Sequence, residues 1–192
     1  HYVNHREVES ADRLLGYLFD YIEQHYEEDE YIVLLYSDHG SSVYARSSYL
    51  LSEEQTGSAL MARGAGVPVL GRVDELTSSV DIYKILGKLV GYPIDADYLD
   101  GNLPEAFSGQ RRAYTVSNSA YPGQTYKLCV RTERHAFHFE SVELTREDGT
   151  IPLDRYTYHI HERNESYREV FDDDLARYFL DIVWQYTESV RR

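Results

Sequence analysis

Asp38 and His39 are adjacent polar residues at the point where the apolar run of residues 31–36 ends, and Gly40 follows them. A carboxylate and an imidazole are suitable ligands for divalent ions of borderline hardness such as Zn, Mn or Fe. Because Gly40 allows a sharp backbone turn, both side chains can reach one ion, or each can bind a different ion. A simpler interpretation also exists, in which Asp38 caps a turn or helix and His39 is hydrogen-bonded in a loop. Spacing alone leaves both interpretations open.

Other residues with coordinating or reactive side chains are less suited to a site. His135 and His138 fall on opposite faces of a predicted strand. His159 and His161 share a face and could hold a metal, or could lie at the surface as ordinary polar residues. The single cysteine, Cys129, excludes an internal disulfide bond and is expected to be a small buried side chain in a strand.

Composition bounds the class of protein. The chain has 192 residues, is 42% hydrophobic and has a formal net charge of -14, so it is long enough for a globular core. That charge repels nucleic acids and anionic lipids over most of the surface, and an anionic substrate would need a local cation such as a metal or an arginine. No apolar stretch approaches the roughly 20 residues of a membrane-spanning helix. The first residue is His1 and the only methionine is Met61, so we expect a processed or excised piece.

The first part of the sequence has the pattern of an α/β protein. Helical spacing of apolar residues predicts an amphipathic helix over 5–26 and another over 79–90. Residues 31–36 are apolar on both faces, as in a central strand covered by helices, and 58–62 is a second short strand. Residues 41–57 show no regular period and are predicted to form a loop.

The second part of the sequence has the pattern of an α+β protein. Short strands are predicted at 113–116, 125–131, 136–140, 142–144 and 156–160, with a tight turn at 147–149. A final helix follows the acidic residues 172–174, with Leu175, Phe179, Ile182, Val183 and Tyr186 on its buried face. The change of pattern predicts two domains, 1–104 and 105–192.

Several short motifs occur in an order that resembles the C-terminal part of the sulfatase family, within the alkaline phosphatase superfamily. They are DRLLG at 12–16, SDHG at 37–40, an apolar segment leading to Val-Pro at 58–68, VDI at 80–82 with a helix to Gly91, and DGNL at 100–103. Each motif is short, but their order and spacing together are fairly specific. The resemblance implies an α/β fold: the C-terminal portion of a sulfatase-like sheet flanked by helices, followed by a small α+β lobe with an antiparallel sheet and a C-terminal helix.

The resemblance also implies a role for the Asp-His pair. In this family the aspartate of the SDHG motif and the following His or Asn bind the metal that activates the nucleophile and shields the anionic ester. Asp38 and His39 are thereby implied to be metal ligands. The implied cofactor of the intact protein is a divalent metal (Ca, Mn or Zn), and the implied substrate is a sulfate or phosphate ester, with carbohydrate esters among the candidates.

The chain departs from the family pattern in two respects. The family's nucleophile and first metal-binding aspartates precede the motifs matched here, and Cys129 lies too late in the sequence to be that nucleophile. The Lys or His that follows SDHG and grips the ester is also missing, and within 41–57 only Arg46 carries a positive charge. A guanidinium can bind two oxyanion atoms at once, so Arg46 is a candidate substrate-binding residue, or a solvent-facing loop charge.

Two functions follow from these observations. The first is a fragment of a metal-dependent sulfatase-like hydrolase acting on sulfuric or phosphoric esters, inactive alone because the nucleophile lies upstream. The second is a non-catalytic sulfatase-like module for binding or assembly. No nucleic acid is expected as a partner, and the sequence does not fix the oligomeric state or the compartment.

Overall fold

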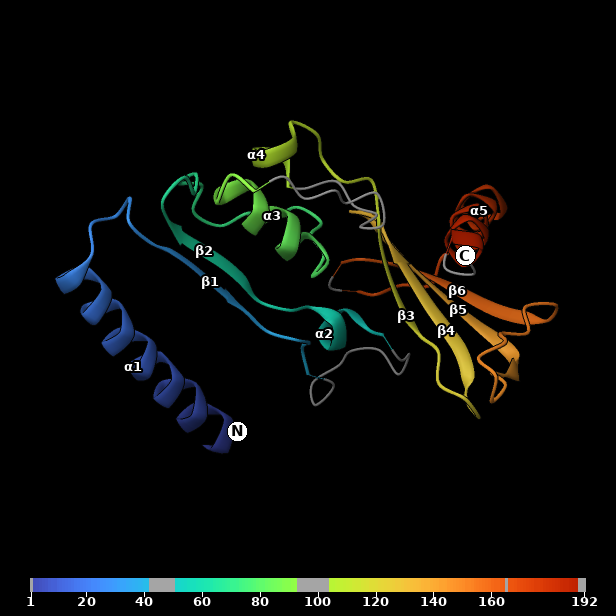
Figure 1. Cartoon of the computed structure of the whole chain (residues 1–192). Coiled ribbons are helices and arrows are strands. Elements are labelled where there is room, and N and C mark those ends of the chain that lie inside the picture. The colour runs from blue at the N-terminus through green and yellow to red at the C-terminus, as the bar shows by residue number, and fades with distance from the viewer. Residues whose placement is uncertain (1, 42–50, 93–103, 165, 190–192) are drawn as a thin grey trace. The chain divides into compact units, whose positions relative to one another are not determined.

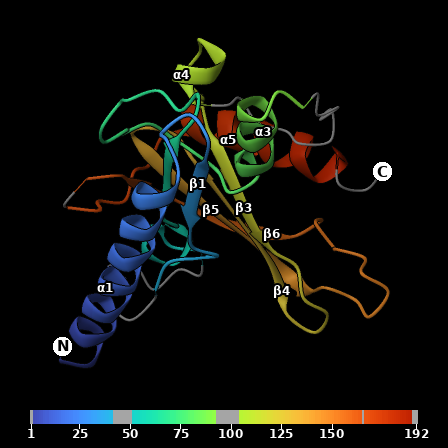
Figure 2. The ribbon, with the colours of Figure 1, turned by 60° about the vertical axis from the view of Figure 1, so that its left-hand side comes forward.

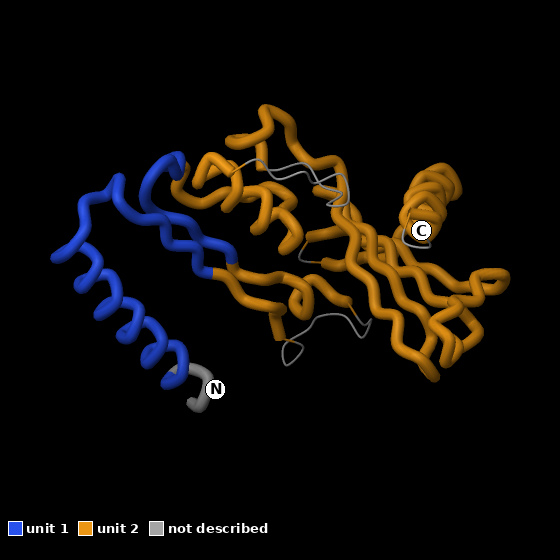
Figure 3. Tube along the Cα trace, viewed as in Figure 1, with its two compact units in different colours: residues 1–35, 60–69 blue, residues 36–59, 70–192 orange. Residues whose placement is uncertain are grey.

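The structure is a computed structural model that describes residues 2–41, 51–92, 104–164 and 166–189 (Figure 1). Its elements, in chain order, are α1 (Tyr2–His25), β1 (Ile32–Tyr36), α2 (Glu53–Thr56), β2 (Leu60–Gly64), α3 (Asp81–Leu89), α4 (Glu105–Ser108), β3 (Thr115–Ser119), β4 (Thr125–Arg131), β5 (His135–Leu144), β6 (Tyr156–Glu162) and α5 (Asp173–Ser189). None of the described helices combines the length and hydrophobicity that a membrane crossing requires. The chain forms two compact units, residues 1–35 with 60–69 and residues 36–59 with 70–192 (Figure 3).

The first unit contains α1 and a two-stranded sheet of β1 and β2. Arg63 of β2 connects the sheet to the helix: its guanidinium lies 2.8 Å from a carboxylate oxygen of Glu23 and over the ring of Phe19. Most apolar side chains of α1 nevertheless stay exposed, Val8 among them. Two strands present too narrow a surface to cover a helix of 24 residues.

The strand β1 is less enclosed than its sequence predicts. Residues 32–35 are half-buried, and in the described part of the chain β1 pairs with β2 alone. The pairing is antiparallel, because the N–H of Ala65 donates to the carbonyl of Tyr31 at one end and the N–H of Ser37 donates to that of Ala59 at the other. A strand that is apolar on both faces needs cover on both faces, and the described residues supply that cover only in part.

A four-stranded antiparallel sheet and the helix α5 form the core of the second unit (Figure 2). The strands lie in the order β3-β4-β5-β6, and one face of the sheet is apolar. Phe179 of α5 stacks on Phe137 of β5 with ring centroids 5.1 Å apart, and Trp184 meets Phe139 edge to face. The buried cluster consists of Tyr126, Leu128, Val130, Phe137, Phe139, Ile160, Ala176, Phe179, Ile182 and Val183.

The opposite face of the same sheet is polar. The strand pairing places Ser117, Cys129, His138 and His159 side by side across all four strands, so their side chains share this face. Arg131 lies two residues beyond Cys129 on the same face of β4. A chain with a net charge of -14 therefore gathers imidazoles and a guanidinium on one side of its C-terminal sheet.

A buried ion pair connects α3 to the segment that leads into the C-terminal sheet. A carboxylate oxygen of Asp81, at the start of α3, lies 2.5 Å from a guanidinium nitrogen of Arg112, and both side chains are almost fully enclosed. The second oxygen of Asp81 accepts the backbone N–H of Ser78. Asp81 belongs to the VDI motif of the sequence, so the structure gives the aspartate of that motif a structural role.

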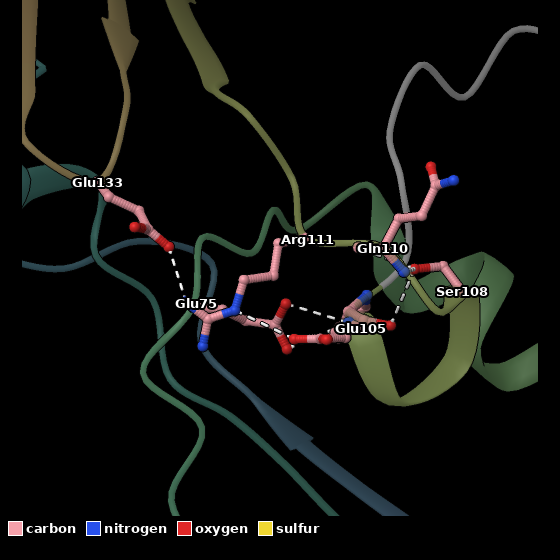
Figure 4. A network of polar contacts seen from close by, with 7 residues as sticks. Glu75, Glu105, Ser108, Gln110, Arg111 and Glu133 are labelled. Carbon is pink, nitrogen blue, oxygen red and sulfur yellow. Dashed lines mark hydrogen bonds and ion pairs between the residues drawn. The ribbon is translucent and has the colours of Figure 1, made fainter.

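A second polar network lies at the surface (Figure 4). Arg111 pairs with Glu105 of α4 and with Glu133 in the turn between β4 and β5, while Glu75 accepts the backbone N–H of Glu105. All three side chains of the ion pairs are more than half exposed to solvent. Exposed pairs of this kind contribute little to stability, so the network mainly orients its segments.

The mixed α/β class, the antiparallel sheet and the C-terminal helix agree with the sequence prediction, as does the buried position of Cys129. The predicted strands 136–140 and 142–144 form one continuous strand, β5. Ser141, which interrupts the apolar pattern, is buried and accepts the N–H of Tyr126 where the register between β4 and β5 shifts. The one-turn helices α2 and α4 were not predicted.

Candidate functional site

Residues 37–40, which we call the Asp-His turn, end β1 and are fixed at both sides by backbone contacts. At the first position, the N–H of Ser37 donates to the carbonyl of Ala59 (3.1 Å), and the Ser37 hydroxyl accepts the N–H of Ala59 (2.8 Å). At the last position, the N–H of Gly40 donates to the carbonyl of Gln55 in α2 (2.8 Å). The serine and the glycine of the motif thus hold the turn, with Asp38 and His39 between them.

Gly40 is required by the close approach of two backbones. A Cβ atom at this position would lie 2.0 Å from the carbonyl oxygen of Glu54 and 2.8 Å from that of Gly57. The next residue, Ser41, donates its N–H to the same Glu54 carbonyl at 2.7 Å. The turn therefore packs directly against α2, which only a residue without a side chain permits.

Asp38 and His39 present their side chains to solvent, with 85% and 73% of each side chain exposed. The Nε2 atom of His39 lies 3.5 Å from the Oδ2 atom of Asp38. His39 Nδ1 lies 2.6 Å from the carbonyl oxygen of Gly40, which can only accept, so Nδ1 carries the proton of the neutral ring. In that tautomer Nε2 has the lone pair that a metal would bind, whereas in the protonated ring Nε2 would donate to the Asp38 carboxylate 3.5 Å away.

The donor set of the turn fits a divalent metal but does not complete a site. Carboxylate oxygen and imidazole nitrogen suit Ca, Mn or Zn to different degrees, and such ions take four or more ligands. Within the described residues, no group of three or more His, Cys, Asp or Glu side chains could hold a metal. The contacts also suit the simpler interpretation, because Asp38 Oδ1 accepts the N–H of His39 at 2.9 Å as a turn cap would.

The other candidates from the sequence that the structure describes lie in the C-terminal sheet. Arg46 lies in residues 42–50, outside the described part of the chain. His159 and His161 share a face of β6 as predicted, but His159 pairs with Glu169 at 2.7 Å and His161 stacks on Tyr167. Desolvation raises the pKa of the buried Cys129 to about 11, so this thiol is unreactive.

A cluster around Tyr167 was not predicted from the sequence. His138 Nε2 and the Tyr167 hydroxyl lie 2.8 Å apart, and Tyr167 adopts a left-handed backbone conformation (φ 44°). Burial lowers the pKa of His138 to about 3, and the positive charge of Arg131 acts in the same direction. His138 is therefore neutral at physiological pH and serves as a buried hydrogen-bonding group.

Two comparisons with known proteins bear on the identity of the chain. Residues 3–92, which include the Asp-His turn, match the family model for Sulfatase. The solved structure of a "putative sulfatase" from Bacteroides thetaiotaomicron VPI-5482 resembles the chain with a TM-score of 0.57 and 17% sequence identity. The similarity covers 84% of this chain and 36% of that one. No curated protein matches the chain significantly.

Together these findings define the class of the protein as a mixed α/β chain with a sulfatase-like fold. The part of the chain that is similar to the sulfatase family is residues 3–92. The chain spans about a third of the length of the solved structure that it resembles, 36%. At 17% identity, that structure supports the similarity in fold alone. The match to the family model includes the motif that contains Asp38 and His39.

Proposed function

We propose that Asp38 and His39 are divalent-metal ligands of a hydrolase acting on sulfuric or phosphoric esters, and that this chain does not supply the nucleophile. The observation that supports the proposal is the geometry of the Asp-His turn. A fixed backbone presents a carboxylate oxygen and an imidazole nitrogen 3.5 Å apart and open to solvent, within a segment that matches the sulfatase family.

Each residue of the turn has a defined part in this proposal. Asp38 supplies the negative charge that attracts a cation, and His39 supplies a neutral nitrogen ligand that the Gly40 carbonyl orients. A divalent ion bound there would polarise an ester oxygen and lower the pKa of a nucleophile. Arg46 remains the proposed clamp for the sulfate or phosphate group of the ester, including esters of carbohydrates.

A second candidate function is a non-catalytic sulfatase-like module for binding or assembly. It is favoured by the absence from the sequence of the Lys or His that the family places after SDHG. Metal binding without ester recognition would fit this candidate. Whether a nucleophile motif precedes these 192 residues in the natural protein would separate the two functions.

Metal titration of the 192-residue chain tests the proposed ligands. We expect Mn²⁺ to bind weakly, with a dissociation constant on the order of 10⁻³ M, because two ligands cannot fill the coordination shell. Asp38→Ala and His39→Ala should each weaken this binding by about tenfold or more. The measurement is electron paramagnetic resonance of free Mn²⁺, with Asp29→Ala as a control for the loss of one carboxylate from the acidic surface. Equal affinity in all four proteins would return Asp38 and His39 to the role of turn residues.

We also expect the isolated chain to show no hydrolysis of aryl sulfate or aryl phosphate esters. The reason is chemical: the described residues offer only a partial ligand set, and the single thiol is buried with a raised pKa and so is not an activated nucleophile. The assay includes Mn, Ca and Zn in turn. Metal-dependent turnover that survives repurification and disappears in Asp38→Ala would contradict this expectation.

A further inference from the structure

The segment 51–57, which contains α2 and which we call the α2 segment, is the surface on which the Asp-His turn rests. It is too short to be stable by itself, since α2 has a single turn. Its capping box is complete: Ser52 is fully buried, its hydroxyl accepts the N–H of Gln55, and the Gln55 side chain accepts the N–H of Ser52. The residue before the cap, Leu51, has a left-handed backbone (φ 65°), a conformation that is unfavourable for leucine.

Arg131 of the C-terminal sheet holds the start of this segment. Its guanidinium donates to the carbonyl of Leu51, a residue 80 positions away in the sequence. The Arg131 side chain is buried, and its Nε atom meets no acceptor among the described residues. The hydrogen bond to the Leu51 carbonyl therefore offsets part of the free-energy cost of burying the Arg131 guanidinium. The same hydrogen bond stabilises the unfavourable backbone conformation of Leu51.

Arg163, which follows β6, holds the middle of the segment. Its guanidinium bonds both carboxylate oxygens of Glu53, at the start of α2, through Nε and a terminal nitrogen. The remaining terminal nitrogen donates to the carbonyl of Thr132, at the end of β4 (2.6 Å). Arg163 is mostly enclosed and Glu53 about half exposed. A two-pronged contact of this kind fixes the direction as well as the distance of the two segments.

These contacts form a continuous path from the C-terminal sheet to the proposed metal ligands. Arg131 and Arg163 hold the α2 segment, and the carbonyls of Glu54 and Gln55 in that segment accept the N–H groups of Ser41 and Gly40. We infer that Arg131 and Arg163 are positioning residues, which keep Asp38 and His39 in their ligand geometry through the α2 segment. The inference has two parts. The mechanical part, that the two arginines hold the Asp-His turn in place, concerns the fold alone. The metal part, that this hold affects metal binding, rests on the proposed function.

Hydrogen exchange of the Gly40 and Ser41 amides measures the mechanical part directly. Because these two N–H groups bond to the α2 segment, their exchange should accelerate about fivefold in Arg163→Met, in Glu53→Ala and in the double variant alike. Equal effects in single and double variants would show that the two residues act through one contact. Arg168→Met is the matched control: Arg168 pairs with Glu162 at the end of β6, and this ion pair does not involve the α2 segment.

The role of Arg131 as a positioning residue is tested through the left-handed backbone conformation of Leu51. Arg131→Met should accelerate exchange of the same two amides, and its effect should be smaller in a Leu51→Gly background, since glycine adopts a left-handed backbone without cost. Exchange of the buried amides of β4 and β5 reports whether the sheet itself has remained folded. Accelerated exchange in the sheet to the same degree as in the turn would make Arg131 a general stabilising residue and would overturn its assignment as a positioning residue.

Metal affinity completes the test. Arg163→Met should weaken Mn²⁺ binding about fivefold without removing any ligand, whereas Arg168→Met should leave it unchanged. If the unaltered chain binds no Mn²⁺ but Gly40 and Ser41 still exchange faster in Arg163→Met, the proposed function fails and the mechanical inference stands. If exchange of both amides is the same in Arg163→Met and in the unaltered chain, the inference is overturned whatever the metal does.

Discussion

Replacing Gly40 by alanine is expected to detach the Asp-His turn from α2 and to abolish measurable Mn²⁺ binding. The added Cβ would lie 2.0 Å from the Glu54 carbonyl oxygen, closer than real Cβ contacts come, and the obstacle is backbone. The two segments must therefore separate, which breaks the hydrogen bonds of Gly40 and Ser41 to the α2 segment. Losing two backbone hydrogen bonds costs about 2 kcal/mol locally, enough to open the turn most of the time.

Gly16→Ala is the matched control for this substitution. Gly16 lies inside α1, where a Cβ atom would meet nothing within 4 Å. The same chemical change there should stabilise the helix by about 0.5–1 kcal/mol, because alanine is the better helix former. Amide exchange and Mn²⁺ titration of both variants measure the contrast. If Gly40→Ala kept the protection of the Gly40 and Ser41 amides, the close packing of the turn on α2 would be wrong.

The parts of the fold that depend on local patterns were predictable from the sequence. The stripe of Phe179, Ile182 and Val183 is long enough to identify α5, and its residues are indeed buried in the core. The alternation in β4 identified that strand with its observed bounds, 125–131. Such elements bury one regular face, and a regular face leaves a period in the sequence. The division into domains 1–104 and 105–192 stays a prediction.

The support of the site was not predictable in the same way. The Asp-His turn could be located because its ligands are adjacent, but the α2 segment is held by Arg131 and Arg163, which lie 80 and 110 positions away from their partners. A single arginine in a strand gives no indication of what it will contact. One signal was present and missed: Ser52 and Gln55 have the spacing of a capping box, which predicts a helix start inside the expected loop.

Breaking the ion pair between Asp81 and Arg112 is expected to have the largest effect on stability. Only 1% of the Asp81 side chain and 6% of the Arg112 side chain are exposed. Removing one partner takes this opposite charge away from the other buried charge, which typically costs about 3–5 kcal/mol. The free energy of unfolding of a typical domain is only about 5–15 kcal/mol. Asp81→Ala or Arg112→Met should therefore lower the denaturant concentration at which the second unit unfolds by a large amount.

The single tryptophan makes this prediction measurable, because Trp184 packs on Phe139 in the core of the second unit and its fluorescence reports unfolding there. Arg72→Met is the matched control: Arg72 pairs with Asp74 at 2.6 Å, but both side chains are largely exposed, so its midpoint should not move. The double variant Asp81→Ala with Arg112→Met should be more stable than either single variant, because it removes both buried charges of the pair. A double variant as unstable as the sum of the two single variants would show that Asp81 and Arg112 act independently, through their other contacts.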